Sequence, residues 1–368
     1  MLAAGGTGGH LFPAEALARQ LAKTGAEVHL ATDRRADAFA AALPGVSVTV
    51  VRAGRLGGGP VQAACGVAEM ALGLMQARRL LRRLAPEAVI GFGGYPSVPT
   101  MLAASRLGLP TVIHEQNAVL GRANRLLAPR ARRIATGFAE TAGLRDGDRE
   151  RAVHTGNPVR PAIVAVGAIA YRPPAPNQPI ELVVLGGSQG ARVFAEIVPP
   201  ALALLPPELR ARLRLSLQAR PEDRAQAAAQ LEESGVAAEV ESFFTDVPDR
   251  LARAQLVICR AGASTISELA AAGRPALLVP YPHAADDHQA ANARAFADAG
   301  AGWIAPQSSL DAPLLAGRLT DMLGDSGKLA AAAAQARRFG KDDAAESLAE
   351  IVLSLTPGSS GARKERAA

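Results

Sequence analysis

Residues 180–192 read IELVVLGGSQGAR, an apolar run that ends in a glycine-rich turn and leads into a helical pattern. A shorter version opens the chain, where residues 2–10 read LAAGGTGGH. A glycine turn between a strand and a helix lets backbone N–H groups approach an anion at the positive end of the helix. Because the pattern occurs twice, it predicts two similar α/β halves, each with a loop that suits phosphate groups.

Short apolar runs alternate with amphipathic stretches along the chain, which is typical of parallel sheets covered by helices. In the first half, we expect strands at 27–32, 47–52, 88–92, 111–115 and 133–136, and helices at 14–24 and 61–84. In the second half, we expect strands at 180–185, 212–218, 240–243, 256–260 and 275–279. Only residues 1–4 precede the first glycine loop, so the first strand is short or begins upstream. The predicted fold class is α/β, with two Rossmann-like domains that face one cleft.

The length of 368 residues agrees with two domains, since a domain usually holds about 100–200 residues. The proline-rich segment 158–179 shows little periodic pattern and is expected to be a linker. The tail 356–368 is polar and rich in Gly and Ser, which predicts disorder.

Composition narrows the class of protein. Hydrophobic residues make up 49% of the chain and charged residues 20%, which excludes a disordered or fibrous protein. Cys65 and Cys259 stand far apart, which excludes a disulfide scaffold or a cysteine zinc site and fits a reducing compartment. Without a signal peptide or an apolar run of about 18 residues, the chain is expected to be soluble and cytoplasmic. The net charge of +6 permits an anionic partner, but aromatic residues at 4% disfavour nucleic acid.

The glycine loops by themselves do not identify the ligand that they bind. Neither loop matches the dinucleotide fingerprint G-x-G-x-x-G. Asp33 nevertheless stands at the end of the second expected strand, where a ribose-binding acid would lie. A nicotinamide- or flavin-dependent oxidoreductase is therefore one alternative, and simple tight turns are another.

Polar residues also follow the expected strand 256–260. Thr265 and Glu268 fit a capping box, in which a hydroxyl caps a helix and a carboxylate follows three residues later. The same helix start lies where doubly wound sheets bind ligands, so Glu268 is also a candidate for the ribose hydroxyls.

Two groups of acids and histidines raise the question of a metal. His283, Asp287 and His288 lie in one loop, but a further ligand at characteristic spacing is missing, so sugar hydroxyls suit this loop better. Asp146 and Asp148 lie in a charged stretch and are interpreted as a solvated turn. We therefore expect no metal site.

Seven motifs follow one another along the chain: GGTGGH (5–10), GGYPS (93–97), HEQN (114–117), GNPVR (156–160), GGSQGAR (186–192), RAGAST (260–265) and the loop 283–289. Together they resemble the MurG family, which adds N-acetylglucosamine to a lipid-linked muramyl-pentapeptide in peptidoglycan synthesis. The resemblance covers the chain apart from its tail and implies a GT-B fold. It implies an acceptor domain at 1–160, completed by a last helix at about 338–354, and a UDP-GlcNAc-binding domain at 161–337.

The resemblance also implies site residues. In the first domain, Thr7, Gly8 and Gly9 would approach the donor, and Asn117 would contact its sugar. In the second domain, the resemblance implies Arg160 and Ser188 for the diphosphate, the backbone of Phe244 for the uracil, Ala263, Ser264, Thr265, Ile266, Ser267 and Glu268 for the nucleoside, and Gln289 for the sugar hydroxyls. It implies no metal or other cofactor.

The implied reaction is a single displacement that inverts the anomeric carbon. The leaving diphosphate gains negative charge, which hydrogen-bond donors must stabilise. The loop 187–190 and Arg160 can supply these donors without a metal. His10, with an ordinary pKa of about 6.5, is the candidate base that removes the acceptor proton. Glu115 is the alternative base, and His10 would then orient its loop or bind acceptor phosphate.

The expected helix 61–84 has two distinct faces. Six residues share a face that we expect to be core: Val67, Met70, Leu74, Ala77, Leu81 and Leu84. A second sector has apolar residues followed by a basic collar: Ala71, Leu72, Met75, Arg78, Arg79, Arg82 and Arg83. This sector suits an anionic membrane surface, and an ordinary surface helix is the alternative.

For partners and location, the resemblance implies UDP-GlcNAc, an undecaprenyl-linked acceptor and the cytoplasmic face of the inner membrane. Cell-wall synthesis proteins are further candidate partners. Two alternative functions remain: another GT-B enzyme on a UDP-sugar, such as a glycolipid synthase or an epimerase, and the oxidoreductase. The motifs at 114–117 and 188–192 favour the MurG-like function over another UDP-sugar enzyme, and the absent G-x-G-x-x-G fingerprint disfavours the oxidoreductase.

Overall fold

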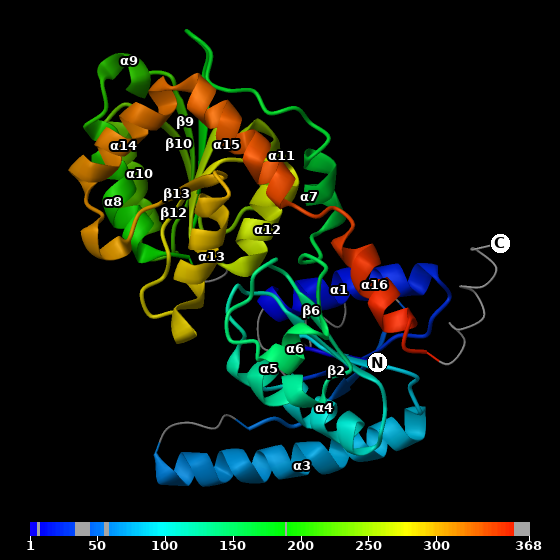
Figure 1. Ribbon diagram of the computed structural model, residues 1–368. Helices are drawn as coiled ribbons and strands as arrows, with labels where there is room; N and C mark the ends of the chain where they lie inside the picture. The colour runs from blue at the N-terminus through cyan, green and yellow to red at the C-terminus, as the bar shows by residue number, and fades with distance from the viewer. Residues whose placement is uncertain (6–7, 34–44, 55–58, 188–189, 357–368) are drawn as a thin grey trace, which may run out of the picture. The chain divides into compact units, whose positions relative to one another are not determined.

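The computed structural model describes residues 1–5, 8–33, 45–54, 59–187 and 190–356. The chain divides into two compact units (Figure 1). The first holds Met1–Val159 and the C-terminal residues from Asp342, and the second holds Arg160–Lys341. The tail for which we expected disorder lies, from residue 357 on, outside the described residues.

The first unit is built on a parallel sheet of seven strands in the order β3-β2-β1-β4-β5-β6-β7. Its strands are β1 (Leu2–Ala3), β2 (His29–Thr32), β3 (Ser47–Val50), β4 (Val89–Gly91), β5 (Thr111–Glu115), β6 (Arg133–Thr136) and β7 (Ala152–His154). The chain leaves β1 toward one edge and returns at β4 to build the other. Open α/β sheets bind ligands at such a switch point, beyond the carboxyl ends of the strands.

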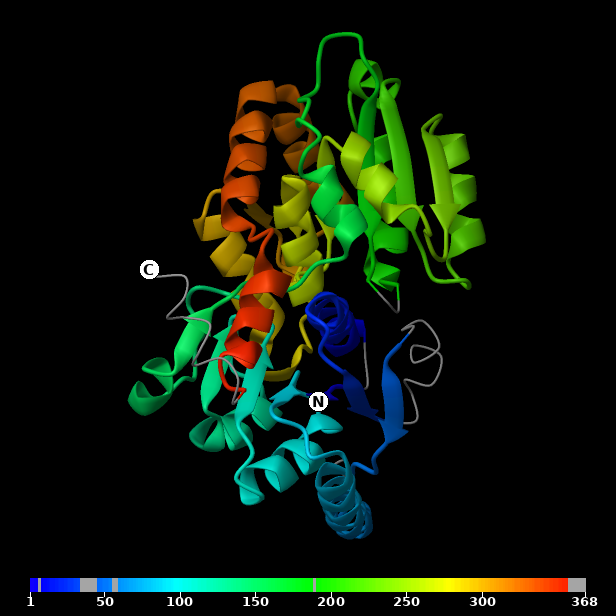
Figure 2. The ribbon, with the colours of Figure 1, turned by 90° about the vertical axis from the view of Figure 1, so that its right-hand side faces the viewer.

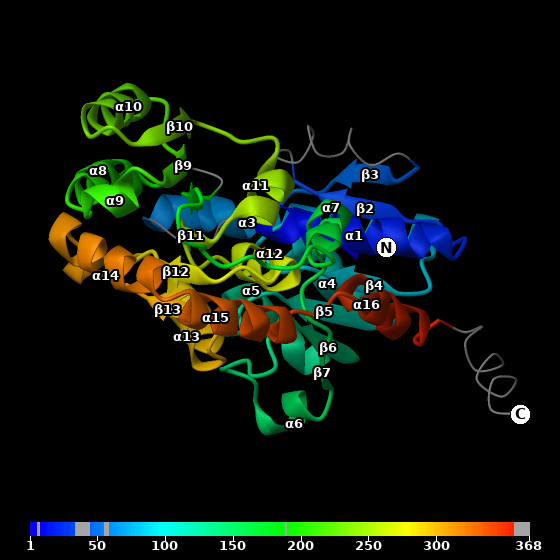
Figure 3. The same cartoon turned by 90° about the horizontal axis from the view of Figure 1, so that it is seen from above.

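The second unit repeats this plan with six parallel strands in the order β10-β9-β8-β11-β12-β13 (Figure 3). They are β8 (Ile180–Leu185), β9 (Leu213–Gln218), β10 (Ala237–Glu241), β11 (Leu256–Cys259), β12 (Ala276–Leu278) and β13 (Gly302–Ile304). The switch point here lies between β8 and β11, so the glycine loop after β8 and the RAGAST segment after β11 share one edge of the sheet.

Helices cover both faces of each sheet. In the first unit they are α1 (Gly8–Lys23), α3 (Pro60–Leu84), α4 (Ser97–Arg106), α5 (Arg122–Leu127), the 3₁₀ turn η2 (Ala128–Arg130), α6 (Asp146–Arg149) and α16 (Ala344–Leu353). In the second unit they are α7 (Pro161–Val166), α8 (Arg192–Ala203), α9 (Pro207–Arg210), α10 (Arg224–Glu233), α11 (Val247–Arg253), α12 (Ala263–Ala272), η3 (Ala285–Asp287), α13 (His288–Asp298), η4 (Gln307–Ser309), α14 (Ala312–Gly324) and α15 (Ser326–Phe339).

The core of the first unit has two layers, one on each face of its sheet. One layer joins Leu17 of α1 and Leu30 of β2 to Leu348 of α16, all fully buried. The other joins α3 and α4 to the opposite face of the strands through residues such as Leu81 and Ile113. The C-terminal helix α16 thus packs on α1 and belongs to the first unit, as Figure 1 shows in red.

Most expected strands lie where the sequence placed them, with differences at the edges. β5, β6 and β8 have the expected bounds, whereas β10 begins and ends earlier than the expected 240–243. The short strands β7 and β13 were not expected. The last helix was expected as one segment but is broken after Phe339, because Gly340 lies so close to the backbone of Ala270 that a side chain would not fit.

The long helix α3, seen nearly along its axis in Figure 2, differs from the expected core face at two positions. Met70 and Leu81 pack in the core as expected, but Val67 is 58% exposed and Leu84 is 37% exposed. The reason is close backbone packing: a Cβ on Gly73 would overlap the carbonyl oxygen of Arg52. This glycine turns toward the sheet, so the face that carries Val67 turns away from it.

The segment around α6 also differs from its expectation. Asp148 was interpreted as part of a solvated turn, but only 4% of this residue is exposed. Its carboxylate pairs with Arg151 at 2.6 Å, and the short helix Asp146–Arg149 replaces the turn. Burial of the charge is tolerated because the guanidinium lies against it.

Candidate active site

His10 lies in the first turn of α1, directly after the first glycine loop. Its ring is flanked by the turn after β4, where Gly93 and Gly94 have φ values of +81° and +71°. A Cβ added to Gly94 would lie 3.3 Å from His10 Nε2. The GGYPS motif therefore supplies a side-chain-free turn against which the imidazole packs.

A side-chain amide fixes the tautomer of His10. Gln116 Nε2 donates to the carbonyl oxygens of Phe92 at 3.0 Å and His114 at 3.1 Å. Carbonyl oxygens only accept, so these contacts settle which end of the amide is nitrogen. Gln116 Oε1 then faces His10 Nδ1 at 3.1 Å, and the ring must donate there. In the neutral ring, the lone pair that can take a proton is accordingly on Nε2.

His114 continues the same chain of hydrogen bonds. It is fully buried, and its Nε2 donates to the carbonyl oxygen of Gly156 at 3.2 Å. Its Nδ1 then accepts from Gln116 Nε2 at 3.0 Å. The pKa of His114 is lowered to about 4: burial lowers it most, the hydrogen bond to Gly156 opposes this, and positive charge on His10 adds to the lowering. His114 is therefore neutral near pH 7 and holds Gln116 in place.

Glu115, the alternative base, is bound on all sides by its own loop. Only 2% of the residue is exposed. Oε1 accepts from the backbone N and Nδ2 of Asn117, at 3.0 and 3.2 Å. Oε2 accepts from Gly121 N at 2.8 Å and Asn124 Nδ2 at 2.9 Å. With both oxygens accepting two hydrogen bonds each, Glu115 anchors the loop that carries Asn117, and the geometry favours His10 as the base.

The glycine loop of the second unit is held by Gln218, at the end of β9. Gln218 Oε1 accepts from Gly186 N at 3.1 Å. Its Nε2 donates to the carbonyl oxygens of Gly187 and Ser242, both at 3.2 Å. Gly190 has a φ of +69°, and a Cβ there would lie 2.8 Å from the side chain of Arg220. Position 190 therefore favours glycine.

Two expected ligands of the glycine loops, Thr7 and Ser188, lie outside the described residues. Gly8 and Gly9 begin α1, so their backbone lies at the positive end of that helix.

The expected capping box at the start of α12 is wrong. The helix begins at Ala263, and Gly262, in an extended conformation, occupies the cap position. Thr265 is therefore inside the first turn. Ser267 Oγ donates to the carbonyl oxygen of Ala263, and Ile266 is fully buried in the core. Of the residues expected at the nucleoside, Ser264 and Thr265 are partly exposed at the helix start.

Glu268 contacts Arg160 instead of capping the helix. Arg160 Nε and Nη2 lie 2.9 and 2.8 Å from Glu268 Oε1. Burial raises the pKa of Glu268, while the charge and hydrogen bond of Arg160 lower it. The pair joins the start of α7 to α12, so two residues expected to bind the diphosphate and the ribose are already held side by side.

The remaining expected donor ligands are positioned by their own loops. Gln289 Oε1 accepts from Tyr281 N at 2.9 Å and so closes the loop before α13. Phe244 is 4% exposed, with the Arg250 guanidinium 3.9 Å from its ring centroid. Its buried ring fixes the backbone that follows β10. Over the described ranges of the chain, no three His, Cys, Asp or Glu side chains are grouped to hold a metal ion.

Sequence reasoning missed the bracing residues of both loops. Gln116 and His114 were part of a motif, but no role was assigned to them, and Gln218 was not singled out. A signal was present, because each is a polar residue at or next to the end of a mostly buried strand. Arg260, the first residue of the RAGAST motif, donates to the carbonyl oxygens of Val279 and Pro280.

Comparison with known proteins gives one family over nearly the whole chain. The N-terminal domain of glycosyltransferase family 28 matches residues 1–136, and the C-terminal domain matches 181–348. A protein of Rhodospirillum centenum, named UDP-N-acetylglucosamine--N-acetylmuramyl-(pentapeptide) pyrophosphoryl-undecaprenol N-acetylglucosamine transferase, is 56% identical over 96% of this chain and 93% of its own. A Rhizobium meliloti protein of the same name is 51% identical over 99% and 97%.

Solved structures agree with this result. The crystal structure of Acinetobacter baumannii MurG is 30% identical, with a TM-score of 0.78 over 96% of this chain and 98% of that one. The MnaA–UDP complex of S. aureus, at 14% identity and a TM-score of 0.69, shares the fold. The predicted fold class, two Rossmann-like domains of the GT-B type, is thereby confirmed. The chain belongs to glycosyltransferase family 28 and, within it, to the MurG family that its motifs resemble.

Proposed function

We propose that the chain transfers N-acetylglucosamine from UDP-GlcNAc to the muramyl hydroxyl of undecaprenyl-pyrophosphoryl-MurNAc-pentapeptide, the step from lipid I to lipid II, with His10 as the base. Relatives at 56% and 51% identity carry the name of this transferase. The observation that carries the assignment of the base is the Gln116 contact, which leaves Nε2 as the basic nitrogen of His10. The glycolipid synthase, epimerase and oxidoreductase alternatives have no comparable support.

The reaction begins when His10 Nε2 accepts the proton of the acceptor hydroxyl. The hydroxyl oxygen forms a bond to the anomeric carbon as the bond to the UDP oxygen breaks, which inverts that carbon. Gln116 orients the imidazole and stabilises the imidazolium through its Oε1. A general base of this kind contributes about 10²–10⁴-fold to the rate.

The leaving diphosphate gains negative charge during the same step. We assign its stabilisation to the glycine loop after β8, with Ser188, and to Arg160, since preorganised donors act where charge develops. A planar guanidinium that stays charged suits two phosphate oxygens. On this proposal no divalent metal takes part, and a chelator leaves the rate unchanged.

Donor recognition is assigned to the second unit. Glu268 binds the ribose hydroxyls, the α12 start with Ala263 and Ser264 binds the nucleoside, and Phe244 presents its backbone to the uracil. Gln289, together with Asn117 of the first unit, contacts the sugar. The Arg160–Glu268 contact supports this proposal, because it orders both side chains before the donor arrives.

The first unit is proposed to bind the lipid acceptor at the cytoplasmic face of the inner membrane. Leu72 is 38% exposed and Met75 is 50% exposed on α3. Arg78, Arg79, Arg82 and Arg83 are also exposed on the same helix. Apolar tips beside basic side chains suit an anionic bilayer surface. No helix in the described part of the chain is long and apolar enough to cross a membrane.

The test is transfer of labelled sugar from UDP-GlcNAc to the undecaprenyl-linked acceptor, with and without chelator. Labelled lipid product, formed equally in both, is the expected result. Product from a UDP-sugar other than UDP-GlcNAc, or none at all, would contradict the function, and loss of product with chelator would contradict the metal-free mechanism. Vesicle binding that weakens in salt and in a Leu72→Asp/Met75→Asp variant is expected for the α3 surface.

A further inference from the structure

A pocket of about 400 Å³ lies entirely within the first unit, and no residue of the glycine loops lines it. Four of the side chains that line it are arginines and two are apolar: Arg122, Arg125, Arg130, Arg145, Leu126 and Pro129. Its volume is in the range of sites for small ligands. We name it the arginine pocket.

One helix face supplies most of the arginine pocket. Arg122, Arg125 and Leu126 stand at helical spacings of three and four residues on α5, so they share a face. Leu126 is 48% exposed on it. The opposite face carries Asn124, which is buried and donates to the carbonyl oxygen of His114 at 3.1 Å. The arginine pocket and the His10 site are therefore on different sides of the same short helix.

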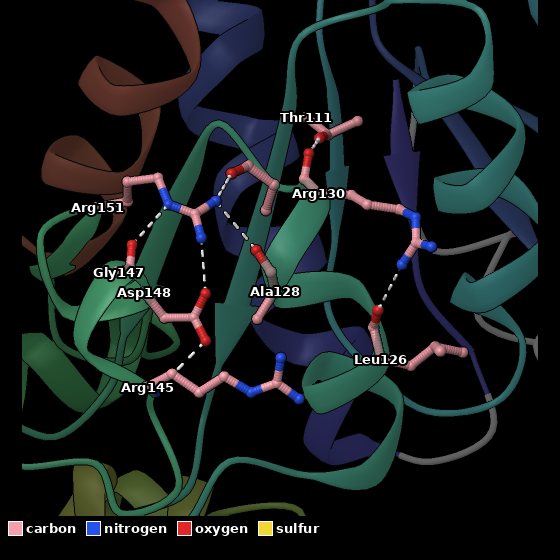
Figure 4. A network of polar contacts seen from close by, with 9 residues as sticks. Thr111, Leu126, Ala128, Arg130, Arg145, Gly147, Asp148 and Arg151 are labelled. Atoms are coloured by element: carbon pink, nitrogen blue, oxygen red, sulfur yellow. Dashed lines mark hydrogen bonds and ion pairs between the residues drawn. The ribbon is translucent and has the colours of Figure 1, made fainter.

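The other wall of the pocket is Arg145, just before α6, and a half-buried ion pair holds this wall in place (Figure 4). Arg151 pairs with Asp148 and also donates to the carbonyl oxygen of Ala128, in the turn that follows α5. The pair ties α6 to η2, the two segments that flank the pocket. It also occupies the carboxylate of Asp148, and every charged side chain that lines the pocket is basic.

The lining defines the chemistry of the ligand. Guanidinium groups bind phosphate oxygens in pairs, and four of them around one hollow match a ligand with more than one negative charge. Leu126 and Pro129 add apolar surface beside the charges. We propose that the arginine pocket binds a diphosphate carried on an apolar chain, at a site outside the reaction centre. The identification of this ligand as the lipid acceptor rests on the proposed function. The binding of a diphosphate to the arginine pocket does not rest on it.

Calorimetry with farnesyl diphosphate tests the proposal, in the presence of excess UDP so that the donor site is filled. We expect the Arg125→Gln/Arg145→Gln variant to bind this probe about 10–100-fold more weakly, since hydrogen bonds to charged groups contribute about tenfold each. Arg132→Gln/Arg149→Gln is the matched control, because it removes two exposed arginines of the same unit that do not line the pocket. Equal weakening in both variants, or none in the first, would overturn the site.

Two further arms identify the ligand class. Leu126→Ser is expected to weaken farnesyl diphosphate more than inorganic diphosphate, because it removes apolar surface and adds no charge to the pocket. If the pocket variant instead loses binding to phosphatidylglycerol vesicles while farnesyl diphosphate is unaffected, the pocket recognises a lipid headgroup and the proposal fails. Transfer by the wild-type protein is measured in parallel, so a failure of the proposed function shows separately from a failure of the pocket.

Discussion

The two glycine loops occupy equivalent places in their sheets, yet they are braced differently. After β1, the chain leads into His10, whose ring nitrogen is bound by the side-chain amide of Gln116. After β8, the side-chain amide of Gln218 bonds to main-chain atoms of Gly186 and Gly187. The two loops thus share one place in the topology, and on the proposed function the first presents a proton acceptor and the second presents main-chain donors to the diphosphate.

The sharpest test of this difference is removal of the imidazole. We expect His10→Ala to lower kcat by about 10²–10⁴-fold, because the acceptor hydroxyl loses its general base. UDP binding, measured by calorimetry, is expected to stay at the wild-type value, since the donor loop belongs to the other unit. A variant that keeps its kcat would remove His10 from the base role.

The buried end of the same hydrogen-bond chain predicts a pH effect on stability. The pKa of His114 is about 4 in the folded chain, below the ordinary 6.5, so the unfolded chain binds more protons between these pH values. Stability therefore falls as pH drops from 6.5 toward 4, by about 3 kcal/mol in total from this group. We expect denaturant unfolding of His114→Asn to show a smaller loss over that range. Parallel losses in variant and wild type would contradict the lowered pKa.

In the unit proposed to bind the donor, the corresponding test is removal of the ion pair between Arg160 and Glu268. Glu268→Gln is expected to weaken UDP binding about 10–100-fold, because it removes a charged acceptor for the ribose and the partner of Arg160. The exposed pair Arg192–Glu196 offers a matched control, since such pairs contribute little. Glu196→Gln should leave calorimetric UDP affinity unchanged. Equal affinities in both variants would take Glu268 out of donor binding.

How far the sequence predicts this molecule depends on the range of the contacts involved. The central strands were predicted because each is a single apolar run in the sequence. The family was predicted because each of its motifs is a continuous stretch of residues. The exposed position of Val67 was not predictable, because it follows from the contact of Gly73 with Arg52, which is distant in sequence.

The site shows the same limit. His10 and Glu268 were named from motifs, but the partner of each lies far away in the chain: Gln116 for His10 and Arg160 for Glu268. The capping box failed for a local reason, because Gly262 occupies the cap position and the helix begins at Ala263, two residues before Thr265. The spacing of apolar residues alone does not show which of two candidate residues caps the helix.

The smallest predicted effects compare the two glutamines directly. Gln218→Leu leaves the N–H of Gly186 and the carbonyl oxygens of Gly187 and Ser242 without their partner, a cost of about 1–3 kcal/mol for each buried group left unsatisfied. The turn relaxes, and the KM for UDP-GlcNAc is expected to rise about tenfold with kcat little changed.

Gln116→Leu is the matched change in the other unit. It frees the His10 ring to rotate and to exchange tautomers, so kcat is expected to fall about tenfold while the KM for UDP-GlcNAc stays constant. In the background of His10→Ala, the same substitution should have no further effect on kcat, because the group it positions is gone. Steady-state kinetics of the three variants separates the roles. If both glutamine variants changed the same kinetic parameter, bracing would be merely structural in both loops, and the division into a proton-accepting loop and a cradling loop would not hold.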